Sequence, residues 1–272
     1  MIKLLCIDMD GTLLSSEGEI SKRTLKDIKA ASEKGVKVVV CTGRVFTSAS
    51  FYSELIGVKA PVIASNGAYI REKDRDEVIY KGLLGMENCK RVLSVCKKHG
   101  IYPHFNTSNT IFTEKIIYSS DYYTKINKTL PEGNKINIEI VENWEECFKL
   151  HKNEILKCIA QDIDDHKIQI AKAELRGMET LTVVSSFDKN FEVMNKGVSK
   201  GSGVKLLAEY YGIVREEIMC IGDNDNDISM LKYAGIGVAM GNSNESIKEI
   251  ANFVTDTNNN DGVAKAIEKF IL

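Results

Sequence analysis

The segment IKLLCIDMDGTLL, residues 2–14, decides the fold of this chain. An apolar run from Ile2 to Ile7 predicts a buried strand, and Asp8 and Asp10 follow it directly. Because residues i and i+2 of an extended segment point to the same side, both carboxylates are predicted to enter one cavity. Two carboxylates about 4 Å apart repel each other by about 4 kcal/mol at an effective dielectric of 20. The pair therefore indicates a bound cation or a retained proton, unless DGT is simply a turn with side-chain hydrogen bonds.

The segments that follow alternate between helix and strand patterns. Ser21–Lys34 predicts a helix with Ser21 as its N-cap and Gly35 just beyond its end. The near-continuous apolar run Val36–Cys41 is typical of a parallel strand covered on both faces, and after a shorter helix residues 61–64 form a third strand. This order predicts an α/β fold with a doubly wound, Rossmann-like parallel sheet. The same alternation resumes later, at Ser199–Tyr211, Glu217–Ile221, Asp227–Tyr233 and Ile236–Ala239, with two short helices expected around Phe253–Thr255.

The middle of the chain has a different character. Residues 68–81 predict a hairpin whose turn is the charged stretch KDRDE, residues 73–77. Residues 83–190 then predict a separate α/β unit, inserted between the two halves of the parallel sheet. Its expected helices are Met86–His99 and Ile163–Arg176, and its expected strands are Ile101–Phe105, Thr110–Thr113, Glu154–Ala160 and Thr180–Val184.

The composition excludes several classes of protein. The chain has 272 residues, of which 43% are apolar and 27% charged, as in ordinary globular proteins. A net charge of −2 gives no case for nucleic acid or a membrane surface as partner. No apolar stretch approaches the roughly 18 residues of a membrane span, and the aspartates near the N-terminus interrupt any signal peptide, so we expect a cytoplasmic protein. Seven cysteines without a CxxC pair and four scattered histidines favour neither a disulfide framework nor structural zinc.

A second acidic cluster, GDNDND at residues 222–227, also follows an apolar strand directly. Carboxylates and amides at a strand end suit a hard divalent cation that keeps several waters, as Mg²⁺ does. The spacing superficially resembles a calcium loop. Such a loop requires Gly at its sixth position and Glu at its twelfth, and counted from Asp223 these positions hold Ile228 and Ala234.

Two weaker signals stand at compatible places. Thr42-Gly43-Arg44 ends the second strand and offers a hydroxyl and backbone N–H groups to an anion. Lys200 begins the helix that precedes the fourth strand. Taken alone, Thr-Gly is a common turn pair and a single lysine is usually a solvated surface residue.

In this order, Asp8-x-Asp10-Gly11-Thr12, Thr42, Lys200 and Gly222-Asp223-x-x-Asn226-Asp227 resemble the four motifs of the haloacid dehalogenase (HAD) superfamily of phosphohydrolases. Only 31 residues (11–41) separate Asp10 from Thr42, whereas 157 (43–199) separate Thr42 from Lys200. An extra domain must lie in the longer interval. This placement resembles the Cof-type subgroup, which implies a HAD-like core at residues 1–82 and 191–272 and an inserted α/β cap domain for substrate specificity at residues 83–190.

The resemblance implies a role for each motif residue. Asp8 would attack phosphorus and form an aspartyl-phosphate, and Asp10 would protonate the leaving oxygen and then deprotonate water. Mg²⁺ would be held by the Asp8 carboxylate, the backbone carbonyl of Asp10 and Asp223. Asp227 would orient Lys200 or a metal-bound water, and Arg44 would reach the substrate or form a surface salt bridge. The expected phosphate-binding residues are Thr42, Gly43, Lys200 and Asn226.

The function implied is that of a phosphoric monoester hydrolase, a Mg²⁺-dependent phosphatase that acts on small phosphorylated metabolites, with sugar phosphates favoured. A phosphotransferase or phosphosugar mutase would use the same intermediate, and the motifs do not separate it from a hydrolase. A non-catalytic phosphometabolite-binding regulator would be expected to lack one of the acidic residues. The aromatic residues of the expected cap receive no role, because such residues usually belong to a core: Tyr102, Phe105, Tyr122 and Tyr123.

Overall fold

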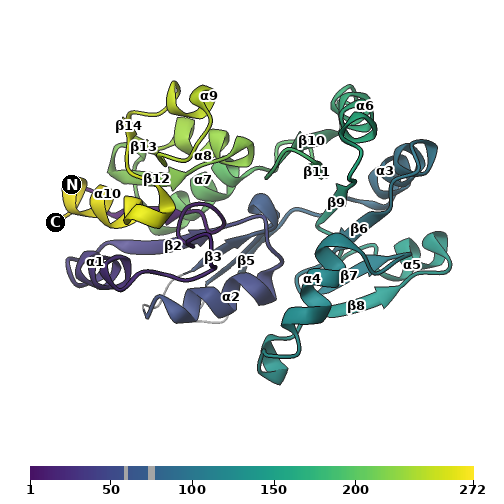
Figure 1. Ribbon diagram of the computed structural model, residues 1–272, viewed down its shortest axis with the longest axis horizontal. Helices are drawn as coiled ribbons and strands as arrows, with labels where there is room; N and C mark the ends of the chain where they lie inside the picture. The colour runs from purple at the N-terminus through teal and green to yellow at the C-terminus, as the bar shows by residue number, and fades with distance from the viewer. Residues whose placement is uncertain (58–60, 73–76) are drawn as a thin grey trace.

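The computed structural model describes residues 1–57, 61–72 and 77–272, and its strands form two separate sheets (Figure 1). The larger sheet has eight strands in the order β14-β13-β12-β1-β2-β3-β4-β5. All its neighbours pair in parallel except β3 with β4 and β4 with β5, which are antiparallel. Its strands are β1 (Leu4–Ile7), β2 (Lys37–Cys41), β3 (Val62–Ala64), β4 (Tyr69–Glu72), β5 (Glu77–Lys81), β12 (Ile218–Gly222), β13 (Ile236–Ala239) and β14 (Phe253–Val254).

Helices cover both faces of this sheet because its central strands are apolar on both sides. Leu5 and Ile7 of β1 lie in one core with residues from three helices: α1 (Lys22–Glu33), α2 (Phe46–Leu55) and α10 (Gly262–Phe270). Leu4 and Cys6 point the other way, into a second core with residues from α7 (Lys200–Tyr211), α8 (Ile228–Tyr233) and α9 (Glu245–Lys248). Because side chains alternate along a strand, β1 contributes apolar residues to the cores on both faces of the sheet. This confirms the predicted doubly wound α/β fold.

Local signals in the sequence correctly placed the first helix. The Ser21 side chain accepts a hydrogen bond from the Thr24 backbone N–H at 3.1 Å, which is an N-cap contact. Gly35 has φ +85°, the left-handed conformation that commonly ends helices. The hairpin of β4 and β5 is also present, and residues 73–76 of its expected turn lie outside the described residues.

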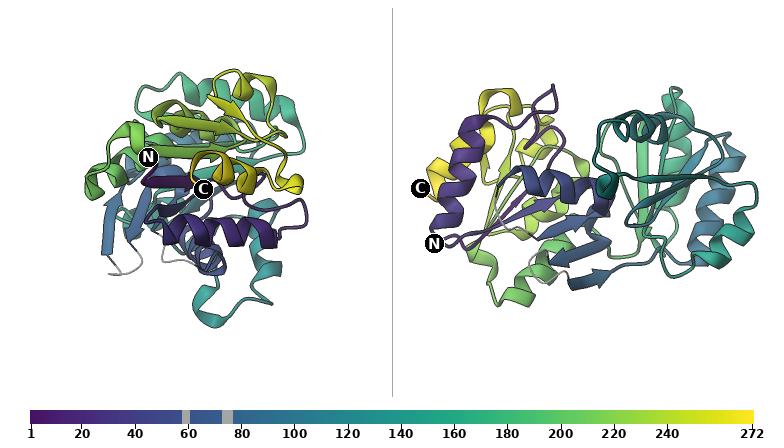
Figure 2. Two further views of the ribbon diagram at one scale, coloured as in Figure 1. Left: turned by 90° about the vertical axis from the view of Figure 1, so that its left-hand side faces the viewer. Right: turned by 90° about the horizontal axis from the view of Figure 1, so that it is seen from below.

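The smaller sheet has six strands in the order β10-β11-β9-β6-β7-β8. On one face, apolar residues such as Phe105, Cys158 and Phe191 pack against the helices α3, α5 and α6. Figure 2 shows this second α/β unit beside the larger sheet. We call residues 86–195 the cap unit. Its strands are β6 (Pro103–Asn106), β7 (Thr110–Thr113), β8 (Asn137–Ile140), β9 (Lys157–Gln161), β10 (Leu181–Val184) and β11 (Asn190–Asn195), and its helices are α3 (Met86–Lys98), α4 (Tyr118–Ile126), α5 (Trp144–Leu150) and α6 (Asp165–Arg176).

One expected boundary is shifted. The sequence placed the return to the larger sheet after residue 190, but β11 pairs antiparallel with both β9 and β10 and runs to Asn195. Phe191 and Val193 complete the apolar core of the cap unit, which explains why the strand belongs there. The elements α4, β8 and α5 have no counterpart among those expected from the sequence. Within the described ranges, no helix is long and apolar enough to cross a membrane.

His104 on β6 predicts a pH-dependent term in stability. Burial lowers the pKa of His104 to about 4, so the folded protein holds this imidazole neutral while the unfolded chain binds a proton below about pH 6.5. The contribution of His104 to the free energy of unfolding therefore decreases as pH falls from 6.5 to 4, by about 3 kcal/mol at pH 4. The asparagine of the His104→Asn variant does not titrate, so we expect the free energy of unfolding of this variant to decrease less than that of the wild type between pH 6.5 and 4. Urea unfolding of both proteins at several pH values measures the difference, and parallel curves would contradict the prediction.

Candidate active site

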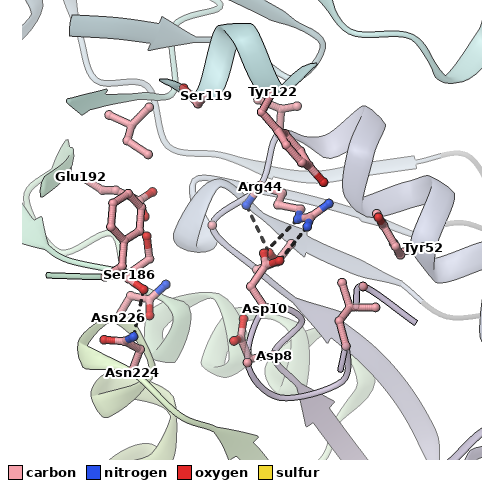
Figure 3. Close-up of a pocket in the computed structure, with 18 of the residues that line it drawn as sticks. Asp8, Asp10, Arg44, Tyr52, Ser119, Tyr122, Ser186, Glu192, Asn224 and Asn226 are labelled. Atoms are coloured by element: carbon pink, nitrogen blue, oxygen red, sulfur yellow. Dashed lines mark hydrogen bonds and ion pairs between the residues drawn. The ribbon is translucent and has the colours of Figure 1, made fainter. Parts of the chain in front are cut away.

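The candidate active site lies where three neighbouring parallel strands end. β1 pairs with β2 on one side and with β12 on the other, so that Ile7 lies beside both Val40 and Ile221. The loops that follow these strands therefore emerge at one edge of the sheet. They carry the motifs at residues 8–12, 42–44 and 222–227 that the sequence singled out. Figure 3 shows side chains from all three loops around one pocket.

Three aspartates converge at this edge. Asp8, Asp223 and Asp227 each place a carboxylate oxygen within 4.8 Å of the others. As expected from the sequence, the two acidic motifs come together, at Asp8 and Asp223. Thr12 fixes Asp223 by donating its hydroxyl proton to Oδ1 at 2.6 Å. Gly11 permits this approach, because it has φ +80° and a Cβ there would lie 2.4 Å from the Asp223 Oδ2.

Lys200 is the cation inside the cluster. Its side chain has no exposed surface, and its Nζ donates to Asp8 Oδ1 at 2.5 Å and to Asp227 Oδ1 at 2.6 Å. The other carboxylate oxygen of Asp227 accepts from the backbone N–H groups of Asp223 and Asn224 at 2.9 and 3.0 Å. Both oxygens of Asp227 are therefore engaged, and this residue holds Lys200 and the acidic loop in place.

The electrostatics of the cluster fit a divalent cation. Burial and the charge of Asp227 raise the pKa of Asp8 well above its ordinary value, although Lys200 opposes the shift. Burial and Asp227 also raise the pKa of Asp223 to about 6. Burial alone would lower the pKa of Lys200, but Asp227 and Asp8 raise it well above its usual range, so this lysine is charged. The raised pKa values of Asp8 and Asp223 indicate that one lysine does not compensate three carboxylates, and oxygen donors of this kind suit hard metal ions.

Asp10 points away from the three carboxylates. Its carboxylate accepts two hydrogen bonds from Arg44, from Nε at 2.9 Å and from Nη2 at 2.6 Å (Figure 3). Burial would raise the pKa of Asp10, but the hydrogen bonds and charge of Arg44 outweigh it and hold the pKa below its usual value. The guanidinium also lies over the Tyr52 ring, 4.8 Å from its centroid. The sequence left Arg44 between a substrate contact and a surface salt bridge, and the structure places it in a salt bridge inside the pocket.

The expected phosphate-binding residues surround the same place. Thr42 is buried, and its hydroxyl accepts from the Arg44 backbone N–H at 3.2 Å. The Gly43 carbonyl accepts a hydrogen bond from Lys157 of the cap unit at 2.5 Å. The Asn226 side chain donates to Asn66 Oδ1 at 3.1 Å. Thr42, Gly43 and Asn226 line the pocket, whereas Lys200 lies behind Asp8 and is no part of its wall.

Asn66 is a site residue to which sequence reasoning gave no role. Its φ of 54° is left-handed, and its side chain donates to Glu192 of the cap unit at 2.9 Å while accepting from Asn226. The next residue, Gly67, has φ +93°, and a Cβ there would lie 2.1 Å from the Ser199 carbonyl oxygen. The Asn-Gly pair that ends β3 was the available signal for this tight turn.

The pocket is a cavity of about 860 Å³ between the larger sheet and the cap unit. Tyr122 and Tyr123 line it, whereas Phe105 belongs to the apolar core of the cap unit and Tyr102 is half-exposed elsewhere. Sequence analysis missed most of the wall that the cap unit provides. The missed residues are Asn106, Tyr118, Ser119, Lys157, Ile159, Gln161, Ser186, Phe187 and Glu192.

Comparison with known proteins identifies the class. The family model for haloacid dehalogenase-like hydrolases matches residues 5–267. The chain belongs to this family of hydrolases, which confirms the resemblance found in the motifs. Membership also supports a metal ion at the acidic cluster, because HAD enzymes use one.

Relatives and solved structures agree along nearly the whole chain. The phosphatase YcsE of Bacillus subtilis, named as acting on 5-amino-6-(5-phospho-D-ribitylamino)uracil, is 33% identical over 271 residues, which are 100% of this chain and 96% of that protein. A haloacid dehalogenase-like hydrolase structure from B. subtilis has a TM-score of 0.87 at 29% identity and covers 99% of this chain and 100% of its own. A HAD subclass IIB sugar phosphatase has a TM-score of 0.80 at 29% identity, with 98% of each chain covered. These similarities confirm the expected enzyme class, a phosphatase.

Removing the central cation should destabilise the protein strongly. In Lys200→Met the methionine side chain fills similar space but leaves Asp8 and Asp227 buried without a counter-charge. We expect a loss of about 3–5 kcal/mol in the free energy of unfolding, as when one partner of a buried ion pair is removed. Urea denaturation measures it. The matched control is Lys205→Met on the same helix, where the lysine is exposed and its pair with Glu209 spans 3.9 Å; there we expect less than about 0.5 kcal/mol. Equal losses in the two variants would be inconsistent with this view of Lys200.

Proposed function

We propose that this protein is a Mg²⁺-dependent phosphatase that hydrolyses small phosphomonoesters, sugar phosphates above all, through an aspartyl-phosphate on Asp8. The observation that carries the proposal is the convergence of Asp8, Asp223 and Asp227, with Asp8 and Asp223 in the wall of one cavity and Lys200 bound to Asp8 from behind. The cavity volume of about 860 Å³ is within the usual range for small-molecule sites. Membership of the HAD-like hydrolases supports the same chemistry.

Each motif residue takes one role in the proposed reaction. An oxygen of Asp8 attacks phosphorus, the bond to the leaving oxygen breaks, and Asp10 donates a proton to that oxygen. Asp10 then takes a proton from the water that attacks the aspartyl-phosphate, which releases inorganic phosphate and restores Asp8. The phosphoryl oxygens would be held by Thr42, the Gly43 backbone, Lys200 and Asn226, and Asp227 would orient Lys200.

The donor set for Mg²⁺ is the Asp8 carboxylate, the backbone carbonyl of Asp10 and Asp223. When bound there, Mg²⁺ neutralises charge on the transferred phosphoryl group. The engaged oxygens of Asp227 support its role as a residue that positions the loop. The Asp10 carboxylate likewise faces Arg44, so the backbone of Asp10 is the part available to the metal site.

The ion pair between Arg44 and Asp10 has a consequence for the acid step. A general acid must carry a proton, but Arg44 keeps the pKa of Asp10 low and its carboxylate ionised. In the proposed reaction, Arg44 therefore leaves Asp10 when substrate enters and turns its donors to the substrate. Its place in the pocket wall, beneath the aromatic rings of Tyr52 and Tyr122, supports this exchange.

The Asp8→Asn variant should lose turnover with its fold intact, because a carboxamide cannot act as the nucleophile. We expect release of inorganic phosphate from p-nitrophenyl phosphate to fall by at least about a thousandfold. The matched control is Asp225→Asn, which alters an acidic residue of the second motif that is paired with Arg176 at the surface. Near-wild-type turnover by Asp8→Asn, with unchanged circular dichroism, would remove the nucleophile assignment.

Removal of the metal should silence the enzyme reversibly. Treatment with a chelator is expected to abolish phosphate release, and added Mg²⁺ to restore it, because Asp8 and Asp223 would then repel the incoming phosphate without compensation. In Asp223→Asn, half-maximal activity should require a higher Mg²⁺ concentration than in the wild type. Full activity in excess chelator would contradict metal dependence.

A further inference from the structure

The cap unit presents a polar sheet face to the cavity. In β6, β9 and β11, side chains alternate between the apolar core and the opposite side. The register pairs Asn106 with Lys157 and Ile159 with Glu192, and all four line the cavity. The part of the site opposite the phosphate-binding loops is thus a wall on three adjacent strands, which is a rigid support for recognising the leaving group of a substrate.

The cation that these three strands place in the wall is already paired. Lys157 donates to Glu192 and to the Gly43 carbonyl, and both side chains of the ion pair are at most 3% exposed. Arg44, the other cation at the cavity, lies on the loop after β2 rather than in this wall, and it pairs with Asp10. Among the described residues that line the cavity, no other lysine or arginine is present. The wall therefore offers no free positive charge to a second phosphate or carboxylate on the substrate.

Asn106 carries a buried polar atom of this wall that has no hydrogen-bond partner among the described residues. It is 4% exposed, and its Oδ1 is buried with no hydrogen bond from any described residue. An unpaired buried amide oxygen is unfavourable, which makes it a strong acceptor for any donor that enters. Asn106 also lies directly across the strand pair from Lys157, whose Nζ contacts the phosphate-binding loop at Gly43. The free acceptor is therefore close to the place where the phosphoryl group is expected.

We propose that Asn106 selects the leaving group by accepting a hydrogen bond from one of its hydroxyls, so that the preferred substrates are monophosphates with an uncharged, hydroxyl-rich leaving group. This inference rests on the proposed phosphatase function and adds a specificity-determining residue to it. A carboxamide both accepts and donates, which suits a group that carries neighbouring hydroxyls. With Lys157 engaged, the wall provides no cation for the second anion of a bisphosphate.

The test compares two substrates in one pair of proteins. For wild type and Asn106→Leu, kcat/KM is measured with sorbitol 6-phosphate and with p-nitrophenyl phosphate, whose leaving group carries no further hydroxyl. We expect the ratio of the two kcat/KM values to fall about three- to tenfold in Asn106→Leu, the usual worth of one hydrogen bond. The matched control is Asn137→Leu, the same change at an exposed position of β8, which should leave the ratio unchanged. An unchanged ratio in a folded Asn106→Leu overturns the proposal.

A second measurement uses only the wild-type protein and so does not depend on the folding of a variant. Glucose 6-phosphate is compared with its deoxy analogues and with glucose 1,6-bisphosphate. Loss of one particular hydroxyl should lower kcat/KM, and the bisphosphate should be a poorer substrate than the monophosphate. A preference for the bisphosphate, or turnover of p-nitrophenyl phosphate with none of the polyol phosphates, overturns the inference and leaves the phosphatase function standing. Absence of turnover with every phosphomonoester overturns both.

Discussion

The site depends on the concentration of negative charge around one buried lysine. Asp8, Asp223 and Asp227 come from two loops far apart in sequence, yet their oxygens lie within 4.8 Å of one another. Such an arrangement is stable only because Lys200 bridges two of them and because backbone N–H groups hold the far side of Asp227. The remaining charge is what attracts a metal ion, so stability and chemistry have the same source.

The sheet imposes the geometry that this charge requires. Pairing of β1 with β2 and β12 brings three loops to one edge of the sheet. Helices pack against the apolar side chains on both faces of these strands and so hold the loops in place. The cap unit uses its own sheet in the opposite way. Three helices cover one of its faces, α4 packs on part of the other face around Ile111, and polar side chains of β6, β9 and β11 face the cavity. Two sheets of different construction therefore line one cavity, and the proposed function divides the reaction and its selectivity between them.

Much of the first sheet and of the acidic cluster could be predicted from the sequence. Continuous apolar runs mark parallel strands, and Asp8 and Asp223 follow such runs directly, so their convergence followed from strand order. The polar wall of the cap unit could not be predicted in this way. Asn106 and Lys157 belong to short strands, and the sequence of a short strand does not tell what its polar side chains face. The sequence named no strand at β11 and placed residues 191–195 with the larger sheet's part of the chain for a related reason. The pairing of β11 with β9 is a long-range contact that local pattern does not encode. Similarly, the pair of Arg44 with Asp10 is a matter of side-chain direction rather than of sequence spacing.

The two connections between the larger sheet and the cap unit are equally short. Residues 82–85 join β5 to α3, and residues 196–199 join β11 to the helix that begins with Lys200. Four residues span at most about 14 Å, and each connection contains a glycine at positive φ with open space around it, Gly85 and Gly197. Any movement of the cap unit relative to the larger sheet would therefore have to be absorbed by these two short connections, and one of them ends directly before the lysine at the centre of the site.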